Sequence, residues 1–80
     1  MNLENEVKQA LYNYFDHSDQ LAFQDDRGDG HHFSLTVISD KFTGLSRLER
    51  HRLIQKILSD FIQTDKIHAL RMRLKTYNEQ

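Results

Sequence analysis

The first fifteen residues carry hydrophobic side chains at the spacing of an amphipathic helix. An apolar residue recurs every three or four positions: Leu3, Val7, Leu11 and Tyr14. Residues with this spacing share one side of an α-helix, which has about 3.6 residues per turn. Asn2 can cap the first turn, and Glu4 and Glu6 lie where the helix dipole favours negative charge. The pattern therefore predicts a helix from residue 2 to about residue 15.

Two segments on either side of a glycine-containing turn have the pattern of β-strands. The first is a short apolar patch at residues 21–23, and the second, residues 32–39, alternates between apolar and polar positions. The apolar face of the second segment is formed by Phe33, Leu35 and Val37. Residues 24–30, which contain Gly28 and Gly30, separate the two segments. The pattern predicts an antiparallel hairpin with a loose loop.

The longest predicted element is a helix in the second half of the chain. Ser46 and Glu49 have the spacing of a capping box, so we expect the helix to begin there and to run to about Gln63. Its expected apolar face consists of Leu48, Ile54, Ile57, Leu58, Phe61 and Ile62. The helical period of these residues predicts that the helix packs on the sheet through this face.

A third alternating segment, residues 67–75, follows a short turn at residues 64–66. One side is apolar (Leu70, Met72, Leu74), and the other carries Ala69, Arg71, Arg73 and Lys75. The pattern predicts a strand, but the order of elements leaves open which of the two earlier strands it pairs with. We expect residues 77–80 to form a frayed tail.

The element order predicts an α+β sandwich, with two helices on one face of a three-stranded sheet. The chain has 80 residues, enough for one small core, and it shows no repeat and no linker. We therefore expect one domain spanning residues 1–80. A core of this size rarely encloses a substrate pocket, and no Gly-x-Ser-x-Gly motif is present, so we expect a protein that is not an enzyme.

Composition narrows the chemistry that the chain can perform. It contains no cysteine, which excludes a disulfide framework, a thiol nucleophile and a thiolate metal site built by this chain alone. A metal bound by the chain would need histidine or carboxylate ligands, and five histidines are present. No apolar run is long enough to span a membrane, and the first residues are acidic, unlike a signal peptide. We therefore expect a cytoplasmic protein without a membrane partner.

Three histidines are candidate metal ligands. His68 begins the third predicted strand, on the side of its apolar residues but at the accessible end. It is either a half-buried histidine with one hydrogen bond or a ligand, since neutral imidazole binds iron, zinc and copper well. His31 and His32 end the glycine-containing turn, and neighbouring residues of a strand face opposite ways. A shared site of these residues with His68 would lie at one end of the sheet.

The net charge of −1 hides a difference between the two halves of the chain. Residues 1–40 carry a net charge of −6, and residues 41–80 carry +5. The basic half contains a set of candidate nucleic-acid-binding residues: Arg47, Arg50, His51, Arg52, Arg71 and Arg73. These residues either contact phosphates or form an ordinary solvated face whose charge the acidic half neutralises.

Several motifs in a fixed order resemble the BolA family. Residues 39–46 read Ser-Asp-Lys-Phe-Thr-Gly-Leu-Ser, residues 50–52 read Arg-His-Arg, and residues 67–70 read Ile-His-Ala-Leu. The resemblance runs over residues 21–76, and the short loop is similar to that of the acid-stress type of BolA protein. The resemblance implies a fold like that of a class II KH domain, with the order αββαβ.

The same resemblance implies a function with two alternatives. BolA-like proteins form heterodimers with monothiol (CGFS) glutaredoxins and share a bridging [2Fe–2S] cluster that also uses glutathione. On this chain the implied ligands are His68 and one of the loop histidines, His32 or His31. We expect no tightly bound cluster on the isolated chain, which would be a monomer or a weak homodimer. Some bacterial members are instead DNA-binding transcriptional regulators of morphology and stress. The family's C-terminal Thr-Pro-x-x-Trp is replaced by Thr-Tyr-Asn-Glu-Gln.

Overall fold

The computed structural model describes residues 2–80 and shows eight short elements of secondary structure. In chain order they are α1 (Leu3–Tyr12), β1 (Gln20–Asp25), β2 (His32–Ile38), η1 (Asp40–Phe42), α2 (Arg47–Ile57), α3 (Ser59–Gln63), β3 (Ala69–Lys75) and η2 (Tyr77–Glu79). Both predicted caps are present: the Asn2 side chain accepts from the Asn5 amide, and Ser46 and Glu49 form the capping box of α2. Among residues 2–80, none of the helices has the length and hydropathy of a membrane-spanning segment.

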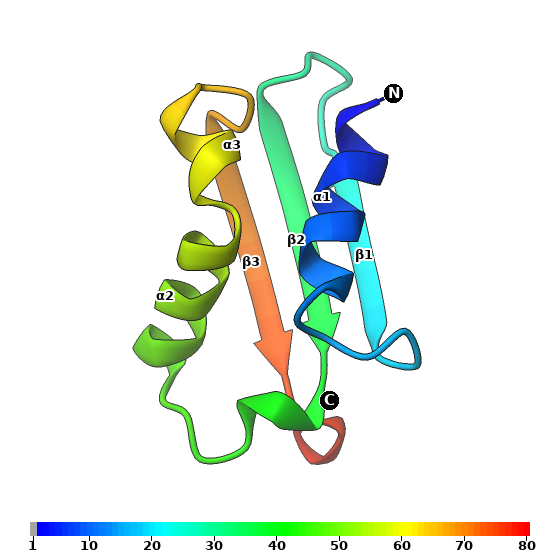
Figure 1. Ribbon diagram of the computed structural model, residues 1–80, viewed down its shortest axis with the longest axis vertical. Coiled ribbons are helices and arrows are strands. Elements are labelled where there is room, and N and C mark those ends of the chain that lie inside the picture. The colour runs from blue at the N-terminus through cyan, green and yellow to red at the C-terminus, as the bar shows by residue number, and fades with distance from the viewer. Residues whose placement is uncertain (1) are drawn as a thin grey trace.

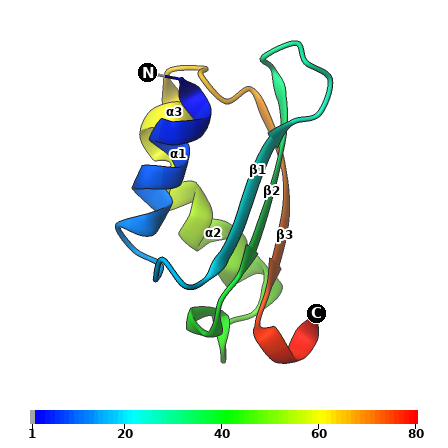
Figure 2. The ribbon, with the colours of Figure 1, turned by 90° about the vertical axis from the view of Figure 1, so that its right-hand side faces the viewer.

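The strands form one mixed sheet in the order β1-β2-β3 (Figure 1). β1 and β2 pair antiparallel as predicted, and β2 and β3 pair parallel, with His32 opposite Ala69 and Ile38 opposite Lys75. The pairing that the sequence left open is therefore made with β2, and both β1 and β3 are edges. All the α-helices lie on one face of the sheet, and its other face is bare (Figure 2). The predicted α+β fold is confirmed.

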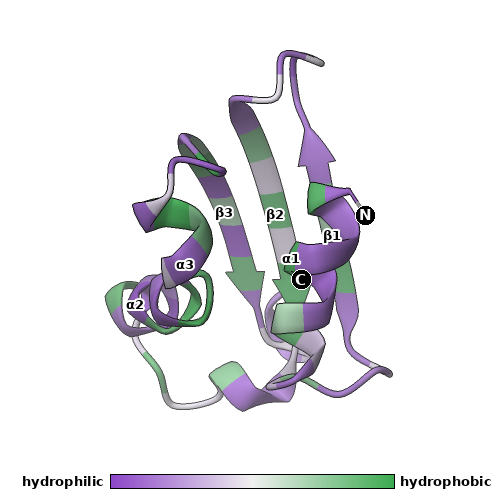
Figure 3. Ribbon diagram, turned by 45° about the horizontal axis from the view of Figure 1, so that its top comes forward, coloured by the Kyte–Doolittle hydropathy of each residue, from purple (hydrophilic) through white to green (hydrophobic). Residues whose placement is uncertain are grey.

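The core fills the space between the helices and the sheet. Hydrophobic and hydrophilic residues alternate along β2 and β3 (Figure 3), so each strand has an apolar side. On the helix-facing side of β2 the buried side chains are Phe33, Leu35 and Val37, as predicted, and they meet Leu11 from α1 and Ile54 from α2 in one hydrophobic cluster. Ile38, at the end of β2, is buried as well. Helix packing on one face leaves the polar residues of the sheet on the other.

Four details of the predicted helices are wrong. α1 ends at Tyr12 instead of about residue 15, so Phe15 turns into the core and Tyr14 stays exposed. The long second helix breaks at Leu58, whose backbone (φ −99°, ψ 17°) departs from helical values and starts α3 in a new direction. Leu48, predicted on the apolar face, is 58% exposed. It lies six positions before the buried Ile54, which places it about 120° around the helix.

Ile62 is the second residue of the predicted apolar face that the structure leaves exposed. It lies in α3, beyond the break at Leu58, so it does not continue the face of α2. The buried positions of the predicted set are Ile54 and Leu58, while Ile57 and Phe61 are partly buried against the core.

The C-terminal residues form an ordered 3-10 helix, η2, so the predicted frayed tail is wrong. The Glu79 carboxylate accepts hydrogen bonds from Nη1 and Nη2 of Arg50 at 2.6 and 3.0 Å, and from the Thr76 amide at 2.9 Å. The Tyr77 hydroxyl lies 3.2 Å from Oδ1 of Asp19, next to the start of β1. These contacts attach the C-terminal residues to α2 and to the segment directly before β1.

The Arg50–Glu79 pair predicts a specific dependence of stability on pH. Hydrogen bonds from Arg50 lower the pKa of Glu79 from its ordinary value of 4.5 to about 2. Since the folded-state pKa is the lower one, the pair stabilises the fold above pH 4.5, and this contribution is lost as the pH falls towards 2. We expect Glu79→Gln to have a lower Tm than the native chain at pH 6, with the difference shrinking towards zero near pH 2. Thermal melts followed by far-UV circular dichroism measure both values.

Asn78→Ala is the matched control for this prediction, because Asn78 lies in the same 3-10 helix but is not among the hydrogen-bond partners of Arg50 in the described residues. It should keep the pH dependence of the native chain. A Glu79→Gln protein whose Tm follows the native curve over the whole range would show that the ion pair contributes nothing to stability.

Candidate functional site

His31 and His68 lie side by side at one end of the sheet. His31 immediately precedes β2, and His68 immediately precedes β3, so the parallel pairing of the two strands brings the residues together. Their ring centroids are 6.3 Å apart and the ring planes meet at 78°. Both residues are exposed, and the Ala69 amide donates to the His31 carbonyl oxygen at 3.0 Å. The two imidazoles are therefore close to each other and open to a ligand or partner.

The loop that carries His31 is held by hydrogen bonds to two carboxylates. Asp25 accepts from the amides of Gly28 and Gly30, both at 2.9 Å, and Asp29 accepts from the His31 amide at 2.8 Å. Gly28 and Gly30 have φ of 68° and 75°, in the left-handed region that favours glycine. The bond from His31 is the main reason why the pKa of Asp29 falls to about 2. The loop therefore presents its histidines from a defined backbone.

His32 takes a different position from its neighbour. It is the first residue of β2, opposite Ala69, and shares the bare face of the sheet with Ser34. Its Nδ1 lies 3.0 Å from Oδ2 of Asp29. An ionised carboxylate can only accept, so Nδ1 is the donor in this contact. Of the three predicted ligands, the structure brings together His31 and His68, and it separates His32 from them by the plane of the sheet.

The two neighbouring imidazoles do not make a complete metal site. Among residues 2–80, no group of three or more histidine, cysteine, aspartate or glutamate side chains is placed to hold a metal ion. Structural and catalytic metal sites in proteins usually take at least three protein ligands. His31 and His68 can therefore supply part of a ligand set, and the remaining ligands have to come from another molecule.

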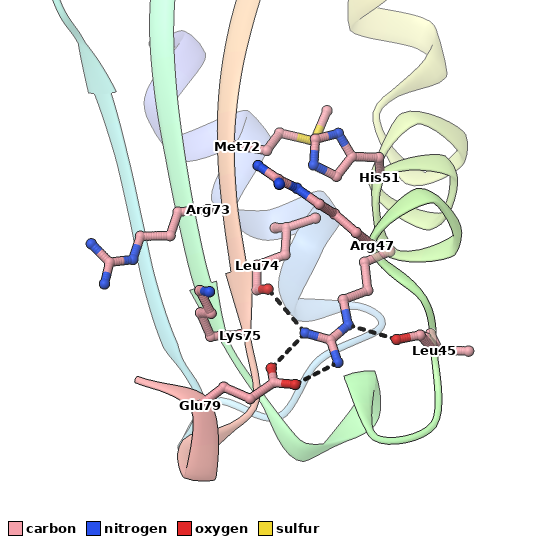
Figure 4. Close-up of a pocket in the computed structure, with 9 residues that line it drawn as sticks. Leu45, Arg47, His51, Met72, Arg73, Leu74, Lys75 and Glu79 are labelled. Carbon is pink, nitrogen blue, oxygen red and sulfur yellow. Dashed lines mark hydrogen bonds and ion pairs between the residues drawn. The ribbon is translucent and has the colours of Figure 1, made fainter.

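A second feature, the basic groove, lies between α2 and the free edge of β3 (Figure 4). It has a volume of about 380 Å³ and is lined by Leu45, Arg47, Arg50, His51, Met72, Arg73, Leu74, Lys75 and Glu79. Arg47 and His51 reach towards Met72 from the helix, whereas Arg73 and Lys75 extend away from the helix on the other side of β3. The groove thus has an apolar floor with basic side chains on both sides.

Arg50 has a structural role within the basic groove. Its guanidinium donates to the carbonyl oxygens of Leu45 at 3.0 Å and Leu74 at 3.2 Å, in addition to the Glu79 carboxylate. The Glu79 hydrogen bond raises the pKa of Arg50. This candidate nucleic-acid-binding residue is therefore engaged within the protein, joining α2, β3 and η2.

The remaining candidate nucleic-acid-binding residues lie on more than one surface. Arg47 and His51 face the groove from α2, Arg52 is exposed on the same helix, and Arg71 and Arg73 are exposed on the bare face of the sheet. Glu79 was not among the residues predicted for this region. Its only signal in the sequence was its place in a tail that departs from the BolA pattern.

Comparisons with known proteins agree on one family. The family model described as BolA-like protein matches residues 3–79. A BolA-like protein of Dictyostelium discoideum is 34% identical over 92% of this chain and 70% of its own length. The DNA-binding transcriptional regulator BolA of Vibrio cholerae is 42% identical over 66% of this chain, which corresponds to only 49% of that protein.

Solved structures agree with the sequence relatives. BolA1 from Arabidopsis thaliana superposes with a TM-score of 0.88 at 26% identity, covering all of this chain and 98% of that one. The similarity therefore extends through the helices, the sheet and the C-terminal residues. The chain belongs to the BolA family.

Proposed function

We propose that this chain is an adaptor that forms a heterodimer with a monothiol (CGFS) glutaredoxin and co-ligates a bridging [2Fe–2S] cluster. The observation that supports the proposal best is the exposed pair of imidazoles, His31 and His68, with ring centroids 6.3 Å apart. Imidazole is an established ligand of [2Fe–2S] iron, where two histidines on one iron replace two cysteines. The donor set of this end of the sheet therefore fits the group.

The ligands that this chain lacks match those that such a partner has. The chain contains no cysteine, and two histidines alone cannot hold a cluster. A glutaredoxin with its bound glutathione offers thiolates, so the two molecules together would complete the ligand set. Replacing anionic thiolates by neutral imidazoles raises the reduction potential of a [2Fe–2S] centre. An adaptor of this kind would change the stability and transfer of a cluster that its partner carries.

The pairing of the strands favours His31 as the loop ligand beside His68. The parallel register sets His32 opposite Ala69, so the preceding residues, His31 and His68, lie at the same level at the end of the sheet. His32 lies on the bare face, where the Asp29 carboxylate orients its ring. In this proposal His31 and His68 bind iron, and Asp29 positions the loop through the His31 amide.

A titration of cluster-loaded monothiol glutaredoxin with this chain tests the proposal. Visible circular dichroism should change as the chain is added and should saturate at one equivalent, because new ligands alter the asymmetry around the iron. The same reconstitution of this chain without glutaredoxin should leave no cluster bound, since its own ligands are too few. A glutaredoxin spectrum that stays unchanged in the presence of excess chain would overturn the proposal.

A second candidate function is DNA binding by a transcriptional regulator. Arg71 and Arg73 form an exposed basic row on the bare face of the sheet, and two relatives, from Vibrio cholerae and Escherichia coli, are named DNA-binding transcriptional regulators. For this function we expect the affinity for duplex DNA to fall steeply as the salt concentration rises. The double variant Arg71→Ala/Arg73→Ala should bind duplex DNA about tenfold more weakly. Electrophoretic mobility shifts at several salt concentrations measure both. Binding no tighter than about 10⁻⁴ M, without sequence preference, would reduce it to unspecific electrostatics.

A further inference from the structure

β3 has a free edge, and the second half of this edge borders the basic groove. The Ala69 amide and the Lys75 carbonyl oxygen bond towards β2, to His31 and Ser39. In a parallel pair the N–H and C=O of one residue point to the same side, and successive residues alternate. The backbone groups of Leu70, Met72 and Leu74 therefore point away from β2. The sheet of the described residues ends at β3, so no strand pairs with them.

Arg50 confirms this direction and marks where the free edge stops. Its Nη1 donates to the Leu74 carbonyl oxygen at 3.2 Å, so that acceptor is occupied. The N–H and C=O of Leu70 and Met72 and the N–H of Leu74 are then the strand-pairing groups of this edge. At about 3.3 Å per residue, the free stretch is about 13 Å long and suits four or five residues of an extended chain.

Basic side chains lie on both sides of this edge. Arg47 and His51 approach it on the helix side, while Arg73 and Lys75 lie on the bare-face side (Figure 4). The one acidic residue that lines the groove, Glu79, is paired with Arg50. A strand added next to β3 would direct its side chains alternately to these two basic sides.

We propose that the free edge of β3 binds an acidic extended peptide segment of a partner protein by strand addition. Main-chain hydrogen bonds to Met72 and Leu74 supply the alignment, and glutamate or aspartate side chains on both faces of the segment meet the basic side chains. The apolar floor of Leu45, Met72 and Leu74 accommodates a small aliphatic side chain between the acidic ones. The part of β3 that lines the basic groove is its C-terminal half, residues 72–75, whereas His68 precedes the first residue of the strand, so the two proposed sites use different residues.

Other occupants fit the groove less well. A second copy paired through its own β3 would set the two rows of Arg71, Arg73 and Lys75 against each other, which destabilises a strand pair. The other edge strand, β1, carries only one acidic residue, Asp25. Single-stranded nucleic acid is held by stacking on aromatic rings, and no phenylalanine, tyrosine or tryptophan lines the groove.

A fluorescein-labelled peptide Glu-Glu-Val-Glu-Glu-Val-Glu-Glu tests the proposal by fluorescence anisotropy. We expect saturable binding that is at least about fivefold weaker for the twin peptide with glutamine in place of glutamate, and similarly weaker for Arg47→Gln/Arg73→Gln. Lys8→Gln/Arg27→Gln removes the same net charge away from the groove and should bind as the native chain does. In ¹⁵N spectra, the amides of Met72 and Leu74 should shift and exchange more slowly with solvent when the peptide is bound.

Four results would overturn the strand-addition proposal. Equal loss of binding in the two double variants would mean attraction by net charge alone, as would unchanged amides at Met72 and Leu74. Displacement of the peptide by an equal concentration of a dT12 oligonucleotide would assign the groove to nucleic acid. A concentration-dependent dimer that excludes the peptide, seen by analytical ultracentrifugation, would assign it to a second copy. None of these results bears on the cluster titration, which probes the histidine end.

Discussion

Replacing Phe42 by alanine is expected to destabilise this protein by about 3–5 kcal/mol, the usual cost of removing a buried phenylalanine side chain. Phe42 is 0% exposed in η1, between the end of β2 and the start of α2. Its ring lies 5.4 Å from the ring of Phe15, and the Arg50 guanidinium lies 5.6 Å from its centroid. One residue thus contacts the segment after α1 and the guanidinium that joins α2, β3 and η2.

This loss is a large fraction of the total free energy of unfolding, because the chain is short. Stabilities of about 0.05–0.15 kcal/mol per residue correspond to about 4–12 kcal/mol for a chain of this length. Urea denaturation followed by circular dichroism should therefore show a strongly lowered midpoint for Phe42→Ala, or a protein that is partly unfolded without urea. Leu48→Ala removes an exposed apolar side chain from α2 and should stay within about 0.5 kcal/mol of the native chain. Equal midpoints for the two variants would contradict the assigned core.

The elements that sequence analysis predicted correctly are those determined by neighbouring residues. The capping box of Ser46 and Glu49 involves residues three positions apart, and the alternation along β2 follows directly from its side chains. The break at Leu58 has no local signal of this kind, because the chain contains no proline and its three glycines lie elsewhere. The direction of α3 depends on packing against the core. The helical spacing of apolar residues continues past Leu58, so the sequence pattern does not indicate the break.

Contacts between residues far apart in the sequence could not be predicted either, because they also have no local signal. The partner of β3 is decided by how the helices cover the sheet, and the ion pair of Arg50 with Glu79 joins residues 29 positions apart. The candidate site contains one feature that the sequence predicts and one that it does not. His68 stands out in the Ile-His-Ala-Leu motif, whereas its distance from His31 follows only from the parallel register. The basic groove depends on the same register, since it requires β3 to be an edge.

The parallel register of β2 and β3 places His31 beside His68. Substitutions of the individual histidines therefore test the cluster proposal most directly. With cluster-loaded monothiol glutaredoxin, His68→Ala and His31→Ala should each lose the change in visible circular dichroism and bind at least about tenfold more weakly, since even outer-shell changes cost 10–100-fold in metal affinity. His32→Ala should retain the spectral change, because its ring lies on the bare face of the sheet, bonded to Asp29. The affinity for cluster-free glutaredoxin should be the same for all four proteins.

His17→Ala is the control for removing an imidazole, because His17 is exposed and stacks on Tyr12, away from both strand ends. It should behave as the native chain in every titration. A lost spectral change in His32→Ala together with a native response of His31→Ala would show that the loop rearranges in the complex and that His32 is the ligand. A native response of His68→Ala would exclude the strand-end histidine and, with it, the cluster-sharing function proposed for this end of the sheet.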